Sequence, residues 1–263
     1  IRSACQERSR QCRCNRNKSR LIKYSNAPTI VVEDYVLSPR LCDRLVDLAQ
    51  KKGLAPNLIN RDGEYIKDHV RTSEGVFFSY GDDDTLDRVI EAFSDMCGLA
   101  PSRLEPVTIQ RYQPGQEYRP HYDAFLPEEM EDLPESSKIE EGGNRCVTMI
   151  AYLNDVQDGG GTVFPVLGFA IQAKQGRVLM FGNLDDNKLP HPASLHMGLP
   201  PEHGDKWILT FWFREKMVNK KDLKQALKPQ KSKEKKQFDR TVHAKNVHEK
   251  FKELCNEKGA LPL

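Results

Sequence analysis

The spacing of hydrophobic residues predicts two helices in the first hundred positions. Between residues 39 and 52, leucines recur every three or four positions, which is the period of a helix with one buried face. A Ser-Pro pair suits the start of this helix, and Gly53 suits its end. A second helix is predicted over 82–98, because apolar residues again follow helical spacing behind three acids that complement the helix dipole.

After residue 105 the pattern changes from helical to extended. Short apolar or β-branched segments alternate with turn clusters of Gly, Pro, Asn and Asp, which is typical of strands. The predicted strands are 29–36 and 75–79, then 106–112, 118–122, 147–153, 162–165, 169–173, 177–181, 194–197 and 206–213. So many short strands favour a mainly β fold, a double-stranded β-helix of the jelly-roll or cupin kind, with the two N-terminal helices flanking one sheet.

Charge is distributed unevenly along the 263 residues. The net charge is only +2, but residues 1–24 carry eight Lys or Arg against one acid, and residues 214–263 carry fifteen against seven. This division predicts three parts, namely a basic N-terminal segment (1–27), one folded domain (28–215) and a lysine-rich C-terminal extension (216–263) with a helix over 238–258. Neither end interleaves aromatic with basic residues, so we expect no nucleic-acid partner.

Neither the cysteine spacing nor the length of the apolar runs identifies a disulfide framework or a membrane span. The seven cysteines are scattered, so no disulfide framework can be read from them. No apolar run is long enough to span a bilayer, and the chain begins with Ile1, so a membrane anchor is expected only upstream of residue 1. We expect a monomer.

A candidate metal site begins at His121 and Asp123. On a strand, alternate side chains point to the same face, so the imidazole and the carboxylate would project together. One more histidine would give two imidazoles and one carboxylate, the facial set that suits non-haem Fe(II).

The third ligand has to come from a later strand. His196 precedes a turn and the apolar strand 206–213, and it is the best candidate. Among the other downstream histidines, His191 lies between two prolines, and His243 and His248 lie in the C-terminal extension. His203 is the remaining alternative. His203 and Asp205 form a second His-x-Asp, but their turn-rich context does not place both side chains on one face.

A longer pattern surrounds these candidate ligands. It comprises, in order, Tyr112, Pro114-Gly115-Gln116, Tyr118, Pro120-His121-Tyr122-Asp123, Asn144-Arg145, Thr148, Tyr152-Leu153-Asn154-Asp155, Gly159-Gly160, Thr162, Phe164-Pro165, Leu195-His196, Gly198, Pro200, Gly204, Lys206-Trp207 and Trp212. This pattern resembles the prolyl 4-hydroxylase family of Fe(II)- and 2-oxoglutarate-dependent dioxygenases. The resemblance runs from about residue 29 to residue 214 and does not cover the basic ends.

The resemblance implies a specific role for each of these residues. Residues 28–215 would be the catalytic domain. Iron would be held by His121, Asp123 and His196, and the cosubstrate 2-oxoglutarate by Lys206. Tyr112, Thr148 and Trp212 would lie beside the cosubstrate, with the two hydroxyls helping to hold its carboxylate.

The resemblance also implies a reaction. Prolyl residues of peptides or proteins would be hydroxylated at the 4-position, while O2 and 2-oxoglutarate are converted to succinate and CO2, with ascorbate as reductant. Asp123 argues for hydroxylation, because related halogenases leave that ligand position open to chloride.

For the substrate side, we expect the segment 57–72 to be a mobile loop that covers a proline-containing peptide. Tyr118 and Trp212 would pack against a proline ring, and Arg145 and Arg214 would hold substrate carbonyls. Two alternatives stay open. One is the same chemistry on a lysyl side chain, a free amino acid or another small molecule, and the other is a binding module that has lost catalysis. For a eukaryotic enzyme we expect the endoplasmic reticulum or secretory pathway, and otherwise the cytoplasm.

Overall fold

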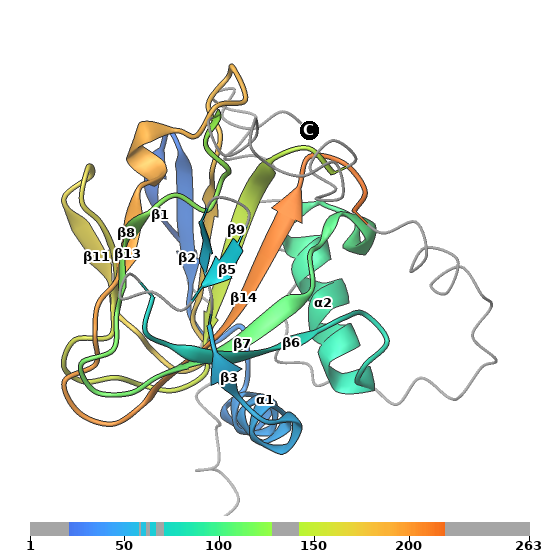
Figure 1. Ribbon diagram of the computed structural model, residues 1–263, viewed down its shortest axis with the longest axis vertical. Coiled ribbons are helices and arrows are strands. Elements are labelled where there is room, and N and C mark those ends of the chain that lie inside the picture. Colours follow the sequence, from blue (N-terminus) through green and yellow to red (C-terminus); the bar gives the residue numbers. More distant parts are fainter. Residues whose placement is uncertain (1–20, 58, 62–63, 67–70, 128–141, 219–263) are drawn as a thin grey trace, which may run out of the picture.

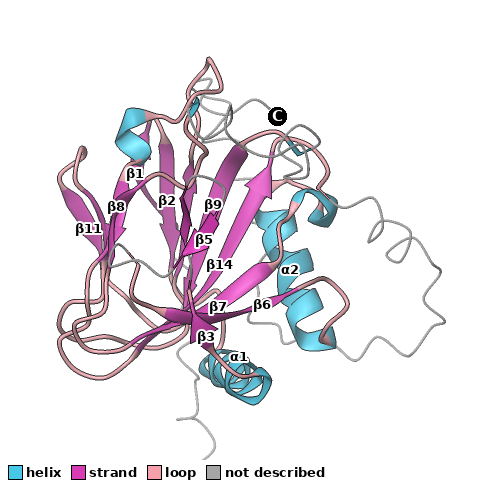
Figure 2. Ribbon diagram, viewed as in Figure 1, coloured by secondary structure: helices cyan, strands magenta, loops and turns pink. Residues whose placement is uncertain are grey.

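The computed structural model describes residues 21–57, 59–61, 64–66, 71–127 and 142–218 (Figure 1). An antiparallel sheet of eight strands faces a smaller sheet of four (Figure 2). In spatial order the large sheet contains β1 (Leu21–Asn26), β2 (Thr29–Glu33), β12 (Val178–Gly182), β9 (Arg145–Tyr152), β14 (Lys206–Arg214), β7 (Val107–Tyr112), β6 (Glu74–Phe78) and β3 (Ala55–Pro56). The small sheet contains β11 (Phe169–Ile171), β10 (Thr162–Phe164), β13 (His196–Gly198) and β8 (Tyr118–His121). This arrangement confirms the predicted mainly β jelly roll.

Both predicted helices are confirmed, and local capping fixes their ends. Helix α1 (Pro39–Lys52) starts after Ser38 and helix α2 (Asp84–Cys97) after Asp83, and both caps accept backbone N–H groups of the first turn through their side-chain oxygens. Gly98 ends α2 in the left-handed conformation. The apolar faces of both helices pack on the large sheet.

The alternation of side chains along each strand determines which residues face the site. Along β14, one set of side chains packs in the core under the helices, and it consists of Trp207, Leu209, Phe211 and Phe213. The intervening side chains face the space between the sheets, and they are Lys206, Ile208, Thr210 and Trp212. The same alternation on β7 and β9 supplies the remaining inner wall, so the large sheet presents polar groups inward only at defined positions.

The structure departs from the expectations in several places, and three of them lie in the N-terminal part of the chain. Residues 21–26, which we assigned to the N-terminal segment, form β1 and pair with β2, so the folded domain begins before residue 28. The strand expected over 29–36 ends at Glu33. The segment 57–72 contains a small hairpin of β4 (Ile59–Arg61) and β5 (Glu64–Ile66) where only a loop was expected.

Short connecting elements and the chain ends complete the description. Two 3-10 turns span Pro101–Arg103 and Pro192–Ser194. Residues 1–20 and the predicted helix over 238–258 lie outside the described residues. None of the described helices is both long enough and apolar enough to cross a bilayer.

Candidate active site

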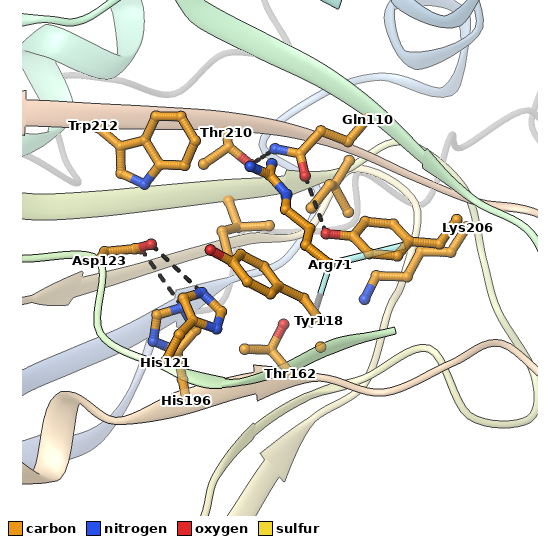
Figure 3. Close-up of a pocket in the computed structure, with 14 residues that line it drawn as sticks. Arg71, Gln110, Tyr118, His121, Asp123, Thr162, His196, Lys206, Thr210 and Trp212 are labelled. Atoms are coloured by element: carbon orange, nitrogen blue, oxygen red, sulfur yellow. Dashed lines mark hydrogen bonds and ion pairs between the residues drawn. The ribbon is translucent and has the colours of Figure 1, made fainter. Parts of the chain in front are cut away.

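Two neighbouring strands of the small sheet bring the predicted metal ligands together. β8 ends at His121, β13 begins at His196, and these two residues are paired in the antiparallel ladder. Nε2 of His121 lies 3.6 Å from Oδ1 of Asp123, and Nε2 of His196 lies 3.6 Å from Oδ2. One ligand atom from each residue lies within 4.8 Å of the others, a spacing that a single ion can bridge (Figure 3).

Backbone carbonyls orient both imidazoles. Nδ1 of His121 lies 2.7 Å from the carbonyl oxygen of Arg119, and Nδ1 of His196 lies 2.9 Å from that of Ser194. When Nδ1 donates to a carbonyl, Nε2 is left unprotonated for a metal. Both Nε2 atoms are the ones that face Asp123, so the tautomer set by these contacts suits metal binding.

The surroundings of His196 and Asp123 shift the pKa values of these two ligands. It lowers the pKa of His196 to about 4, so this imidazole is neutral at pH 7. Burial alone would raise the pKa of Asp123, but the two imidazoles and Arg145 outweigh it and hold the pKa of this carboxyl well below its usual range. Two neutral imidazoles and one carboxylate on a shared face are the donor set of non-haem Fe(II) sites, and they leave coordination positions open.

A buried ammonium group shares the cavity with these ligands. Lys206 opens β14 and is 1% exposed, and its Nζ lies 4.9 Å from the centre of the Tyr112 ring. Burial lowers its pKa to about 7, and among the described residues no carboxylate forms an ion pair with it. A buried ammonium without a counter-charge is costly, so this position fits a site that receives a ligand carboxylate. The metal ligands and Lys206 together therefore suit Fe(II) and a dicarboxylate.

The cavity walls contain both predicted and missed residues. Besides the metal ligands and Lys206, they are formed by Arg71, Gln110, Tyr112, Tyr118, Ile150, Thr162, Gly198, Ile208, Thr210 and Trp212. Tyr112, Tyr118 and Trp212 were expected there. Gln110 and Thr210 were missed, although strand alternation relative to Tyr112 and Lys206 points to both.

Thr148 does not lie where the resemblance placed it. Its hydroxyl donates to Oδ2 of Asp123 across 2.7 Å, and it is not part of the cavity wall near Lys206. The strand register gives the reason. Thr148 pairs with Trp212, six residues along β14 from Lys206, and six residues span ~20 Å. Thr148 therefore supports a metal ligand, and Thr162 and Thr210 are the threonine hydroxyls on the cavity.

Arg145 and Arg214 also have a different place from the one expected. The two residues are paired across β9 and β14, and both donate to the carboxylate of Glu105, at 2.7 and 2.9 Å. Burial alone would raise the pKa of Glu105, but the two guanidinium groups hold it below its usual value. Neither arginine lines the cavity. Arg145 stacks on Trp212 and donates to the carbonyl of Asp123. The cluster of Arg145, Arg214 and Glu105 therefore positions Trp212 and Asp123 from outside the cavity.

Two expected aromatic residues line the cavity beside the metal ligands. The Tyr118 ring stacks on the His121 ring, with centroids 3.4 Å apart and planes 16° apart. The indole of Trp212 also faces the cavity, and its Nε1 has no hydrogen-bond partner among the described residues. These rings leave a flat apolar surface next to the metal position.

Arg71 is a further functional candidate that sequence reasoning missed. Its guanidinium lies 4.9 Å from the Tyr118 ring centre and points into the cavity (Figure 3). The side chain is buried, and neither Nε nor Nη2 has a hydrogen-bond partner within the described part of the chain. An isolated bridge to Tyr118 and three hydrogen bonds between Thr72 and Glu117 place it there. These contacts join distant segments, so no local pattern identifies Arg71.

The competing His-x-Asp motif is not a metal site. His203 is exposed in a turn, and Asp205 forms an ion pair with Arg111 at 3.8 Å. Within the described residues, the only group of three potential ligands close enough for one ion is the one at His121.

Comparisons with known sequences agree with this geometry. Residues 107–214 match the family model of the 2OG-Fe(II) oxygenase superfamily. Prolyl 4-hydroxylase 2 of Arabidopsis thaliana is 32% identical over 219 residues, which cover 74% of this chain and 70% of the relative. Probable prolyl 4-hydroxylase 7 of the same plant is 30% identical over 228 residues, which cover 79% of this chain and 69% of the relative.

Solved structures show the same fold. The 2OG complex of vCPH, a viral collagen prolyl hydroxylase from Paramecium Bursaria Chlorella virus-1, matches with a TM-score of 0.56 at 28% identity, over 70% of this chain and 95% of that chain. A Pseudomonas putida prolyl-4-hydroxylase matches with a TM-score of 0.51 at 18% identity, over 71% of this chain and 92% of that chain.

Proposed function

Because the chain belongs to the prolyl 4-hydroxylase family of 2OG-Fe(II) oxygenases, we propose that it hydroxylates prolyl residues of peptides or proteins at the 4-position. The observation that carries this proposal is the facial set of His121, Asp123 and His196 in one cavity with the ammonium of Lys206, which has no carboxylate partner among the described residues. When bound, Fe(II) with 2-oxoglutarate and O2 supplies the oxidation of a substrate C–H bond, and the cosubstrate leaves as succinate and CO2.

The protein's own groups bind and orient the reactants. The two imidazoles and the Asp123 carboxylate hold the metal. Lys206 donates to the distal carboxylate of 2-oxoglutarate, a charge-assisted interaction that is stronger in a buried cavity than in water. Tyr112, Thr162 and Thr210 place hydroxyl groups on the same cavity.

The substrate side is formed by one cation and two aromatic rings. A proline ring is apolar and its preceding carbonyl accepts hydrogen bonds, so it needs a flat surface and a donor. Tyr118 and Trp212 provide the surface, and Nε and Nη2 of Arg71, which have no partner within the described residues, provide the donor. We assign Arg71 the role of holding a substrate carbonyl that we had first expected of Arg145 and Arg214. Collagen-like and proline-rich chains are the substrate class that this site fits.

A peptide panel tests the proposal. Proline-rich, collagen-like and lysine-containing peptides, together with free amino acids, are incubated with the protein, Fe(II), 2-oxoglutarate and ascorbate. Succinate is quantified, and tandem mass spectrometry locates any gain of one oxygen atom. We expect oxidation on proline, its loss in His121→Ala, and unchanged activity in His203→Ala, which removes the exposed competitor.

Each other result has a defined meaning. Oxidation of lysine or of a free amino acid, with proline untouched, would replace the substrate class and keep the iron chemistry. Absence of succinate with every substrate, although the protein binds metal, would contradict the enzymatic function and favour a binding module.

A further inference from the structure

Gln110 places a buried carboxamide in the cosubstrate cavity. It lies on β7, two residues before Tyr112, and is 2% exposed. Both side chains line the cavity because alternate residues of a strand share a face. A buried carboxamide is stable only when both its N–H groups and its oxygen have hydrogen-bond partners. The partners of Gln110 therefore show which groups of the cavity wall it positions.

The carboxamide connects two hydroxyl groups of the cavity wall. Nε2 of Gln110 donates to Oγ1 of Thr210 across 3.0 Å, and Oε1 accepts from the hydroxyl of Tyr112 across 3.1 Å (Figure 3). β7 and β14 are hydrogen-bonded neighbours, with Gln110 opposite Ile208, so the three groups form one row across the two strands.

The row ends beside the buried ammonium. Lys206 pairs with Tyr112 in the same ladder, and its Nζ lies 4.9 Å from the Tyr112 ring centre. In the close-up, Gln110 and Thr210 lie across the cavity from His121, His196 and Thr162 (Figure 3). A carboxylate that binds Lys206 therefore meets the hydroxyl group of Tyr112, which Gln110 contacts.

The number of protons that the Tyr112 and Thr210 hydroxyls can donate gives the Gln110 carboxamide a specific role. A hydroxyl group has one proton to donate. In the structure, Tyr112 donates its proton to Gln110, whereas Thr210 accepts from Gln110. If the carboxamide turns over, Nε2 donates to Tyr112 and Oε1 accepts from Thr210, and the two hydroxyls exchange roles. A carboxylate only accepts, so Tyr112 can donate to it only in the second orientation, in which Gln110 does not take the Tyr112 proton.

We infer that Gln110 is a positioning residue for the cosubstrate, whose carboxamide orientation sets whether Tyr112 donates to the carboxylate held by Lys206. This inference rests on the proposed function, because the carboxylate is that of 2-oxoglutarate. Gln110 itself acts through Tyr112, and the Thr210 hydroxyl fixes the orientation of the carboxamide, so that the loss of one hydroxyl changes the contribution of the other.

Equilibrium binding of 2-oxoglutarate to the Mn(II)-loaded protein, measured by titration calorimetry, tests the inference without turnover. We expect Gln110→Met to weaken binding about tenfold, which corresponds to about 1.4 kcal/mol, with Mn(II) affinity unchanged. In turnover, the change would appear in KM for 2-oxoglutarate more than in kcat. Gln110→Glu should weaken binding further, because it adds a like charge beside the ligand. Thr108→Val is the matched control, since it removes a buried hydroxyl of β7 that has no partner among the described residues and lies outside the cavity.

A double-mutant cycle tests the coupling without altering Gln110. We expect the effects of Tyr112→Phe and Thr210→Val on 2-oxoglutarate binding to be non-additive, by about fivefold. Additive effects, or an unchanged affinity in Gln110→Met, would overturn the inference. If the wild-type protein bound Mn(II) but not 2-oxoglutarate, the proposed function itself would fail, so the two failures are distinguishable.

Discussion

The hydroxyl of Thr148 donates to Oδ2 of Asp123 across 2.7 Å, and both residues are buried. The side-chain amide of Asn183 in turn donates to Thr148 across 2.9 Å. Thr148 lies on the large sheet, whereas Asp123 follows a strand of the small sheet. The contact therefore fixes the orientation of a metal-binding carboxylate from the opposite layer of the fold, as outer hydrogen bonds do at metal sites.

Removing this hydroxyl should weaken metal binding. Thr148→Val keeps the shape of the side chain but leaves Asp123 without its donor. We expect the affinity for Fe(II) or Mn(II) to fall about tenfold, the lower end of the usual cost of losing such a contact. Metal titration monitored by calorimetry measures this change. Thr108→Val, another buried threonine of the same sheet, should bind metal like the wild type. Equal affinities in the two variants would show that Thr148 is only a packing residue.

Binding of 2-oxoglutarate should take up a proton at alkaline pH. Burial lowers the pKa of Lys206 to about 7, so at pH 8 the free protein holds mostly a neutral amine. A ligand carboxylate favours the charged form, so binding protonates Lys206, and affinity should fall about tenfold per pH unit above 7. Calorimetry at pH 8 in two buffers of different ionisation enthalpy measures the uptake.

The control is Lys206→Met, which should lose both the proton uptake and most of the affinity. Lys51→Met, at an exposed position of α1, should keep both. Stability has the opposite pH dependence. Because the pKa of Lys206 is lower in the folded protein than in the unfolded chain, this residue should make the ligand-free protein more stable as pH rises from about 7 towards 10.5. Binding that is equally tight at pH 7 and 9 would contradict the role of Lys206.

Arg71 should matter for the peptide and not for the cosubstrate. Arg71→Met keeps much of the apolar stem over Tyr118 but removes the guanidinium nitrogens. We expect KM for a proline-containing peptide to rise at least tenfold, which corresponds to ~1.4 kcal/mol for a lost charged hydrogen bond. Peptide-independent turnover of 2-oxoglutarate should stay near the wild-type rate. Arg88→Met, at an exposed position of α2, is the matched control. A parallel loss of both activities would assign Arg71 to the fold or to the cosubstrate instead.

Glu105 should stabilise the fold by compensating two arginines. Glu105→Gln leaves Arg145 and Arg214 side by side with reduced counter-charge, and we expect the free energy of unfolding to fall by about 3 kcal/mol. The pKa of Glu105 is held below its ordinary value of 4.5, so its contribution is complete above that pH and is lost as the pH falls through the lower folded value. Urea unfolding at pH 7 and at lower pH should show the difference from the wild type shrinking with acidification. Glu202→Gln, at an exposed position, should change little.

The sequence by itself determined the metal ligands, the buried lysine and the overall architecture. Period-two alternation puts His121 and Asp123 on one face, and the apolar context of residues 206–213 makes an interior Lys206 conspicuous. Helix caps are equally local, since each involves a side chain and the turn that follows it. Such features depend on residues that are near one another in the chain.

Only the tertiary structure decided which groups meet. Thr148 faces inward as expected, but the register that pairs it with Trp212 puts it at the metal end of the cavity. Arg145 and Arg214 meet Glu105 because β9 and β14 bring them side by side, and Arg71 reaches the cavity through a bridge to Tyr118. Spacing along one strand gives the face of a side chain. Its position relative to other strands depends on pairing and register, which packing of the whole core determines.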